Sequence, residues 1–174
     1  MTAVGEPESV LAIYPFHRGV AYTLFETPLS PLDWGVKRVR GDTKNALLFE
    51  AAQRLIDLHQ PEVLVLEDSS DSIGRRSQRS HRLQMLIVGC AQARAIEVRA
   101  LRKKDIRACF KQLGAVNRYE IAQVIGARVH AFERHVPPVR RLWMREDERI
   151  GLFGAASLAM TFYHQYGHGL MSDG

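Results

Sequence analysis

Residues 63–68 read Val63-Leu64-Val65-Leu66-Glu67-Asp68, an apolar run that stops on an acid. Because every residue before the acid is apolar, the run predicts a strand buried on both faces, as in the interior of a helix-covered sheet. A carboxylate at the C-terminal end of such a strand lies at the sheet edge where open α/β proteins bind their ligands. Glu67 is therefore the first candidate for a site residue. The alternative is a strand-end acid that caps the next element or pairs with an arginine.

The segments on either side of this strand predict an α/β domain with a mixed sheet. Short apolar runs separated by prolines and polar turns predict three antiparallel strands in succession, followed by a helix that leads to the strand of Glu67. Helices dominate the rest of the chain. The expected order is strands at 10–14, 20–25 and 32–40, a helix from Asp42 or Thr43 to about 59, the strand at 63–67, a helix at about 78–94, a strand at 95–101, and helices at about 104–113, 118–133 and 146–166.

Two of the expected helices have an apolar side that predicts which face is buried. In the first helix, the spacing selects Ala46, Leu47, Phe49 or Glu50, Ala51, Leu55 and Leu58. In the second helix, the spacing selects Leu83, Leu86, Ile87, Cys90 and Ala91. These two faces should pack inward.

The length of 174 residues favours one domain. We expect it to span residues 10–166, between a flexible N-terminus at 1–9 and a flexible C-terminus at 167–174. The two cysteines, Cys90 and Cys109, have no metal-like spacing, so they are interpreted as reduced core residues. No apolar stretch approaches the ~18 residues of a membrane span, and the first residues are acidic rather than signal-like. We therefore expect a soluble, cytoplasmic protein with no membrane partner.

A formal net charge of +5 favours an anionic partner, with nucleic acid as the leading candidate. The densest positive segment is residues 74–82, which follows the Glu67 strand in the chain. Its arginines either line one side of a strand-binding groove or form a solvated surface that pairs with Asp68 and Asp71. The candidate phosphate contacts in this segment are Arg75, Arg76, Arg79 and Arg82.

Sequence motifs of several other functional classes are absent. The chain has no GxxxxGK[ST] loop, no GxGxxG fingerprint and no GxSxG elbow, so triphosphatase, dinucleotide-binding and serine-hydrolase functions have no support. His164 and His168 have the spacing of paired helical metal ligands, but their place near Gly167 and the terminus favours surface histidines.

Over residues 10–166 the chain resembles the RuvC-type Holliday-junction resolvases of the RNase H-like superfamily. Three segments carry the resemblance: Leu11-Ala12-Ile13-Tyr14-Pro15, Val63-Leu64-Val65-Leu66-Glu67, and Phe153-Gly154-Ala155-Ala156-Ser157-Leu158-Ala159-Met160. The resemblance implies an RNase H-like fold with a mixed five-stranded sheet flanked by helices. In that family an aspartate ends the first strand, a glutamate ends the fourth, and a C-terminal helix brings two more acids. These acids hold two Mg²⁺ ions that hydrolyse a phosphodiester.

Only the second of the three segments keeps its acid. Tyr14 stands where the family has its first aspartate, and Gly154 or Ala156, depending on the alignment, stands where it has its last. Mg²⁺ prefers hard oxygen ligands in a regular octahedral shell, so Glu67 alone should hold a pair of ions poorly. We predict that Tyr14 fills the former metal site and that its hydroxyl reaches Glu67.

Asp147 is the candidate for a relocated acid. It lies seven residues before Gly154, so on one continuous helix both would point to the same side. Asp147 would then join Glu67 as a catalytic and metal-binding residue. The alternative is a negative charge at the N-terminus of the last helix, where it stabilises the helix dipole.

The resemblance yields three hypotheses for function. The first is a RuvC-like protein with a degenerate, inactive nuclease centre that binds nucleic acid, DNA first, in recombination or repair. The second is an active, structure-selective endonuclease that uses Mg²⁺ or Mn²⁺ with rearranged carboxylates. The third is a protein-interaction module on an inherited fold. By resemblance, Lys103, Lys104 and Arg118 are further phosphate contacts, and a homodimer is expected because resolvases commonly pair through a helix, here the one with the Leu83–Cys90 side.

Overall fold

The computed structural model describes residues 9–16, 19–41, 44–70, 74–139, 147 and 149–165, with residues 75–77 described as backbone alone. Five strands form one mixed sheet in the order β3-β2-β1-β4-β5. β1 pairs antiparallel with β2 and parallel with β4, and β4 pairs parallel with β5. The strands are β1 (Val10–Phe16), β2 (Gly19–Thr27), β3 (Ser30–Arg38), β4 (Val63–Glu67) and β5 (Glu97–Leu101). The predicted mixed five-stranded sheet is thereby confirmed.

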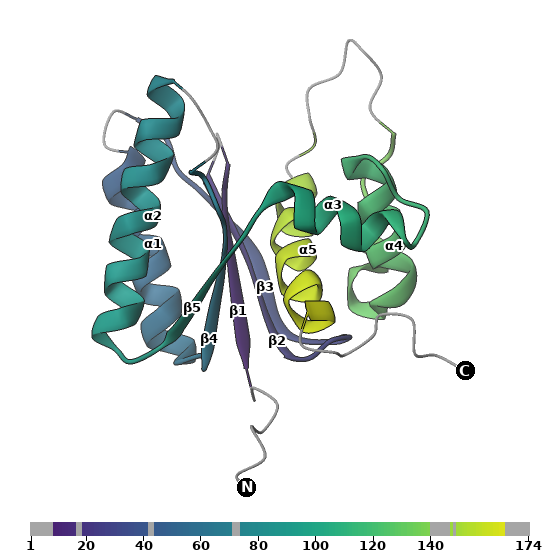
Figure 1. Cartoon of the computed structure of the whole chain (residues 1–174), viewed down its shortest axis with the longest axis horizontal. Coiled ribbons are helices and arrows are strands. Elements are labelled where there is room, and N and C mark those ends of the chain that lie inside the picture. Colours follow the sequence, from purple (N-terminus) through teal and green to yellow (C-terminus); the bar gives the residue numbers. More distant parts are fainter. Residues whose placement is uncertain are drawn as a thin grey trace, which may run out of the picture.

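Helices cover both faces of the sheet (Figure 1). On one side lie two helices that also pack on each other, and on the other side lies a long helix with two shorter ones next to it. The first pair is α1 (Lys44–His59) and α2 (Arg75–Ala93). The second group is α3 (Lys103–Lys111), α4 (Arg118–Arg128), the 3₁₀ helix η1 (His130–His135) and α5 (Arg149–Gln165).

The alternation of side chains along β1 and β4 places the site. Val10 and Ala12 contribute to the core under α5, whereas Leu11 and Ile13 contribute to the core under α1 and α2. Because side chains alternate with a period of two, Tyr14 points to the α5 side. Along β4, Val63 and Val65 also belong to the core under α5, so Glu67 points to the same side.

The register of the parallel pair brings these two residues to the same level. Ala12 pairs with Val65, so Tyr14 and Glu67 each lie two residues farther along, at the C-terminal ends of adjacent strands. All four residues of β4 before Glu67 are buried, as the sequence predicts for an interior strand. The sheet edge predicted from the apolar run is therefore where Glu67 lies.

The apolar side expected for α1 is correct for Leu55, and for Phe49 and Ala51, which pack against the core, but wrong for Leu47 and Leu58. The residues that face the core are Leu48, Ala52, Leu55 and Ile56. Leu47 and Leu58, which the prediction places inside, are 40% and 73% exposed. The helix carries apolar residues on more than one side, so its packing against β2 and α2 fixes its rotation. In α2 the prediction holds for Leu83, Ile87, Cys90 and Ala91, which are buried, but Leu86 is 51% exposed.

Several element boundaries differ from the prediction. β3 begins and ends two residues early, at Ser30 and Arg38. β5 begins at Glu97 because Ala95, with a φ of 55°, lies in a turn after α2. α4 ends at Arg128, and the segment expected to continue it is η1. The expected cap at Asp42 or Thr43 and most of both termini lie outside the described residues.

Two expectations about the core and the helices are tested directly. Cys90 and Cys109 are both free and buried, as expected for reduced core residues. Within the described part of the chain, no helix combines the length and apolarity that a membrane crossing requires.

Candidate functional site

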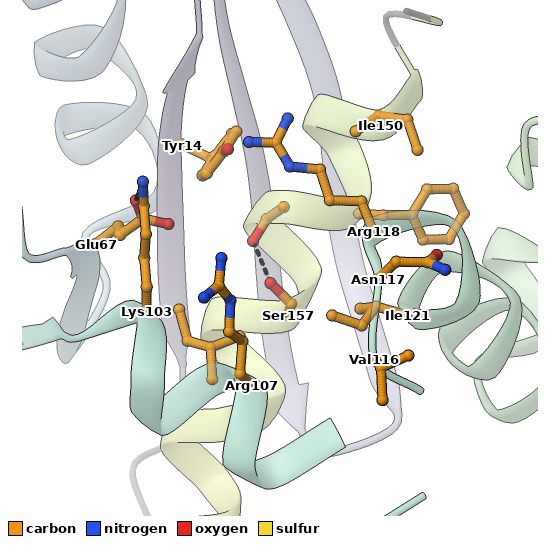
Figure 2. A pocket seen from close by; sticks show the side chains of 13 residues that line it. Tyr14, Glu67, Lys103, Arg107, Val116, Asn117, Arg118, Ile121, Ile150 and Ser157 are labelled. Carbon is orange, nitrogen blue, oxygen red and sulfur yellow. Dashed lines mark hydrogen bonds and ion pairs between the residues drawn. The ribbon is translucent and has the colours of Figure 1, made fainter. Parts of the chain in front are cut away.

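A cavity of about 410 Å³ opens at the C-terminal ends of β1 and β4, under α3, α4 and α5 (Figure 2). Tyr14 and Glu67 supply its wall on the sheet side. Side chains from the three helices supply the rest, so the lining comes from segments far apart in the chain. Four residues predicted from the sequence line this cavity: Tyr14, Glu67, Lys103 and Arg118.

Tyr14 packs directly onto α5 at Gly154. A Cβ atom added to Gly154 would lie 2.9 Å from both Cδ1 and Cε1 of Tyr14, closer than real Cβ atoms approach a neighbour. The ring therefore occupies the space in which residue 154 would carry a side chain. The two positions at which the resemblance implies aspartates, in the alignment that uses Gly154, hold residues that fit one another.

A second aromatic ring repeats this arrangement one helical turn earlier. A Cβ atom at Gly151 would lie 2.9 Å from Cε1 of Phe16. Gly151 and Gly154 are three residues apart and so share a side of α5. Tyr14 and Phe16 are two residues apart and so share a face of β1. The contact between strand and helix thus includes two rings on two glycines. The resemblance implies acids on both of these elements.

Glu67 is surrounded by positive charge. Its Oε1 lies 3.6 Å from Nζ of Lys103, and its side chain is 24% exposed. Burial raises the pKa of Glu67, because the charged form is poorly solvated there. The charges of Lys103, Arg118 and Arg107 oppose this increase in pKa. Of the described residues that line the cavity, Glu67 is the only acid, whereas three lining residues are cationic.

The cavity does not fit the two-metal centre that the fold family implies. Mg²⁺ is held by several hard oxygen ligands, and a second ion would need more carboxylates to balance its charge. Here one carboxylate is paired with Lys103, and the ring of Tyr14 on β1 packs against Gly154 of the facing helix. No cluster of three or more His, Cys, Asp or Glu side chains that could hold a metal occurs among the described residues.

Asp147 precedes α5 and does not line the cavity. Its Oδ1 accepts hydrogen bonds from the backbone N–H and the Nε of Arg149, at 3.0 and 2.9 Å, and its Oδ2 accepts one from Nη2 at 2.6 Å. These bonds hold the pKa of Asp147 below its usual range. This geometry matches the helix-end alternative, and the role of Asp147 as a relocated metal ligand stays a prediction.

The arginines of α2 lie beside a different hollow. Arg79 and Arg82 line a groove of about 820 Å³ together with Lys44 and the strand-end residues Pro15 and Phe16. This groove lies at the N-terminal ends of α1 and α2, on the other side of the β1 terminus from the cavity of Glu67. Its described lining includes three cations and no acid. The side chains of Arg75 and Arg76 lie outside the described residues.

The sequence analysis missed Arg107, which lines the cavity and acts electrostatically on Glu67. The signal was present, because Arg107 lies four residues after Lys103 and so shares its side of α3. Lys104, which was predicted to contact phosphate, is exposed and does not line the cavity. One residue step along a helix turns a side chain by about 100°, so the neighbours Lys103 and Lys104 point in different directions.

Comparisons with solved structures give strong matches to resolvases. RuvC of Thermus thermophilus superposes with a TM-score of 0.64 at 13% identity, over 91% of this chain and 96% of that one. The fold is that of the RuvC resolvases. A second structure of the T. thermophilus protein, in complex with a Holliday junction substrate, gives a TM-score of 0.65 at 13% identity, covering 92% and 97%. The fowlpox virus Holliday junction resolvase gives 0.56 at 10% identity, covering 91% and 99%.

The similarity to known proteins is a similarity of fold. No protein-family model and no curated protein sequence matches the chain.

Proposed function

We propose that this RuvC-like protein binds nucleic acid through the cavity at the ends of β1 and β4 and does not cleave it by metal-dependent hydrolysis. The observation that carries the proposal is the seating of the Tyr14 ring on Gly154 beside the single acid Glu67. A metal centre at this place would need carboxylates on both elements, and the two residues instead fill the space by mutual packing.

The charge of the cavity supports an anionic ligand. Lys103, Arg107 and Arg118 outnumber Glu67, so the lining favours a phosphate over a cation. Figure 2 shows the side chains of Lys103, Arg107 and Arg118 extending into the cavity from α3 and α4. Phosphate contacts of this kind position a nucleic acid without reading its sequence. The Glu67 carboxylate acts in this proposal as the internal counter-charge that a phosphate replaces at Lys103.

The groove of Lys44, Arg79 and Arg82 supports a wider footprint. It lies across the β1 terminus from the cavity, so a bound backbone contacts both sides of this strand end. DNA is the proposed ligand, because two of the solved RuvC-like structures are described as complexes with Holliday junction DNA or substrate. A role in recombination or repair follows from that proposal.

A homodimer is part of the same proposal, but through different residues from those expected. Leu83, Ile87 and Cys90 are buried inside the fold and are unavailable to a partner. On the outer side of α2, Met85 and Leu86 are 55% and 51% exposed. If the protein pairs through α2, these two residues are the contacts.

The experiment that tests the proposed function measures binding and cleavage with the same DNA substrates. Single-stranded, duplex and four-way-junction DNA are each incubated with the protein in Mg²⁺, in Mn²⁺ and in a chelator. We expect binding that weakens steeply with salt and is unchanged by the chelator, with no cleavage products. Divalent-dependent cleavage that is lost in Glu67→Ala would establish the active endonuclease instead. An absence of DNA binding at low salt would favour the third hypothesis, a protein-interaction module.

A further inference from the structure

The cavity of Glu67 has two chemically different zones. Its cations stand at the mouth, where the Lys103 side chain is 57% exposed and Arg107 and Arg118 are also exposed. Its floor is apolar and enclosed: Ile106 is 7% exposed, Ile150 6% and Phe153 2%. The half-buried Ile121 of α4 joins this floor to the mouth.

A phosphate alone would use only one of these zones. The backbone of a paired duplex presents phosphates and sugars and keeps its bases stacked inside the helix, so it would contact the mouth and leave the apolar floor empty. An unstacked nucleotide presents a charged phosphate and a flat, largely apolar base joined by one sugar. Single-strand-binding proteins exploit this by combining cationic contacts to the backbone with aromatic side chains on which the bases stack.

We propose that the cavity takes one unstacked nucleotide, with its phosphate at Lys103, Arg107 and Arg118 and its base against the apolar floor and the adjoining Ile121. The volume of about 410 Å³ lies within the roughly 300–1,000 Å³ range of small-molecule pockets. This inference rests on the proposed function and narrows it. The ligand class is nucleic acid with an unpaired base, as opposed to paired duplex.

The floor and the mouth each combine residues from more than one helix, and these helices meet only in the folded chain. Ile106 and Arg107 are adjacent on α3, Arg118 and Ile121 are three residues apart on α4, and Phe153 lies on α5. α3 thus supplies two cations and one apolar contact, and α4 supplies one of each. This pairing of a charged with an apolar contact on α3 and on α4 matches the two parts of a nucleotide.

The first test compares small ligands on the unmodified protein. Titration calorimetry with adenosine 5′-monophosphate, inorganic phosphate and ribose 5-phosphate separates the contribution of the base from that of the phosphate. We expect adenosine 5′-monophosphate to bind at least tenfold more tightly than either of the others. Equal affinities for the three ligands would overturn the inference.

The second test fills the floor. Ile121→Trp places a large ring in the cavity, and Gln123→Trp places the same ring on an exposed position of α4 that does not line it. We expect at least tenfold weaker binding of single-stranded oligonucleotide by Ile121→Trp and no change for Gln123→Trp, with circular dichroism confirming both folds. The unmodified protein should bind single-stranded oligonucleotide more tightly than duplex DNA, and an oligonucleotide with an abasic position should lose this advantage.

The two proposals fail in different ways. If oligonucleotides bind but neither the base nor the Ile121→Trp substitution affects affinity, the nucleotide cavity is wrong and the backbone-binding function remains. If oligonucleotides do not bind at all, the proposed function itself is wrong.

Discussion

The ring of Tyr14 occupies the space that a side chain on residue 154 would take, because Cδ1 and Cε1 of the tyrosine lie 2.9 Å from where a Cβ atom on Gly154 would be. The two residues are distant in the chain and lie on β1 and α5. A smaller residue in place of Tyr14 would leave a void, and a side chain at residue 154 would clash with the ring, so the two residues are complementary. This relationship joins two positions, one on the strand and one on the helix, at which the resemblance implies acids.

The first prediction concerns the stability of this contact. Gly154→Ala should destabilise the protein by about 1–3 kcal/mol, the usual cost of overpacking a filled interior. In a Tyr14→Ala background the same substitution should cost much less, because the ring is gone. Urea unfolding of the single and double variants measures the coupling.

A matched control exists on α2. A Cβ atom at Gly89 would meet no atom within 4 Å, so Gly89→Ala should stabilise the protein by about 0.5–1 kcal/mol through helix propensity. Equal costs of Gly154→Ala in the presence and absence of the Tyr14 ring would contradict the packing account.

The second prediction is that a metal site can be built at this place. Tyr14→Asp combined with Gly154→Asp removes the ring and places two carboxylates near Glu67. We expect the double variant to bind Mn²⁺ in titration calorimetry, because three converging carboxylates match the ligands that hard divalent ions prefer. Gly154→Asp alone should not bind, since its new side chain would meet the Tyr14 ring.

The control for this engineered site is the neutral pair Tyr14→Asn and Gly154→Asn, which has nearly the same shape and fewer charges. Tight, stoichiometric Mn²⁺ binding at Glu67 of the unmodified protein would argue against a filled metal site.

The third prediction concerns Glu67 and nucleic-acid affinity. Glu67→Gln removes the charge that competes with phosphate for Lys103 and should raise DNA affinity roughly fivefold at neutral pH, which corresponds to about 1 kcal/mol for a unit charge at 4 Å in water. The gain should shrink as pH falls through the raised pKa of Glu67, because the native carboxyl then becomes neutral as well. Fluorescence anisotropy at several pH values measures this. An active metal ligand would show the opposite pattern, with loss of function in the glutamine variant.

The fourth prediction concerns stability against pH. Because the pKa of Glu67 is raised in the folded protein, the native state binds its proton more tightly than the unfolded state. Ionisation of Glu67 therefore lowers the stability as pH rises from the unfolded pKa through the folded one. Glu67→Gln should be more stable than the unmodified protein at pH 7, by about 1 kcal/mol or less, and should lose this advantage in acid. Thermal unfolding followed across pH checks the sign, and an advantage that grows in acid would contradict it.

The fifth prediction separates the cavity cations from their neighbours. Alanine at Lys103, Arg107 or Arg118 should weaken DNA binding and lower the slope of log affinity against log salt by about one phosphate contact each. Lys104→Ala is the control, because Lys104 is exposed next to Lys103 without lining the cavity. If Lys104→Ala has the same effect as Lys103→Ala, binding depends on net charge and not on this cavity.

The sequence by itself determined the sheet and the place of the acid. The apolar run before Glu67 identifies a strand buried on both faces, and alternation along β1 and β4 then puts Tyr14 and Glu67 on one side, because side chains in a strand have a period of two. The tertiary structure decided what surrounds them. The Tyr14–Gly154 contact, the meeting of Arg107 with Glu67 and the rotation of α1 depend on how helices pack on the sheet. Packing joins residues far apart in the chain, and no local period carries that information.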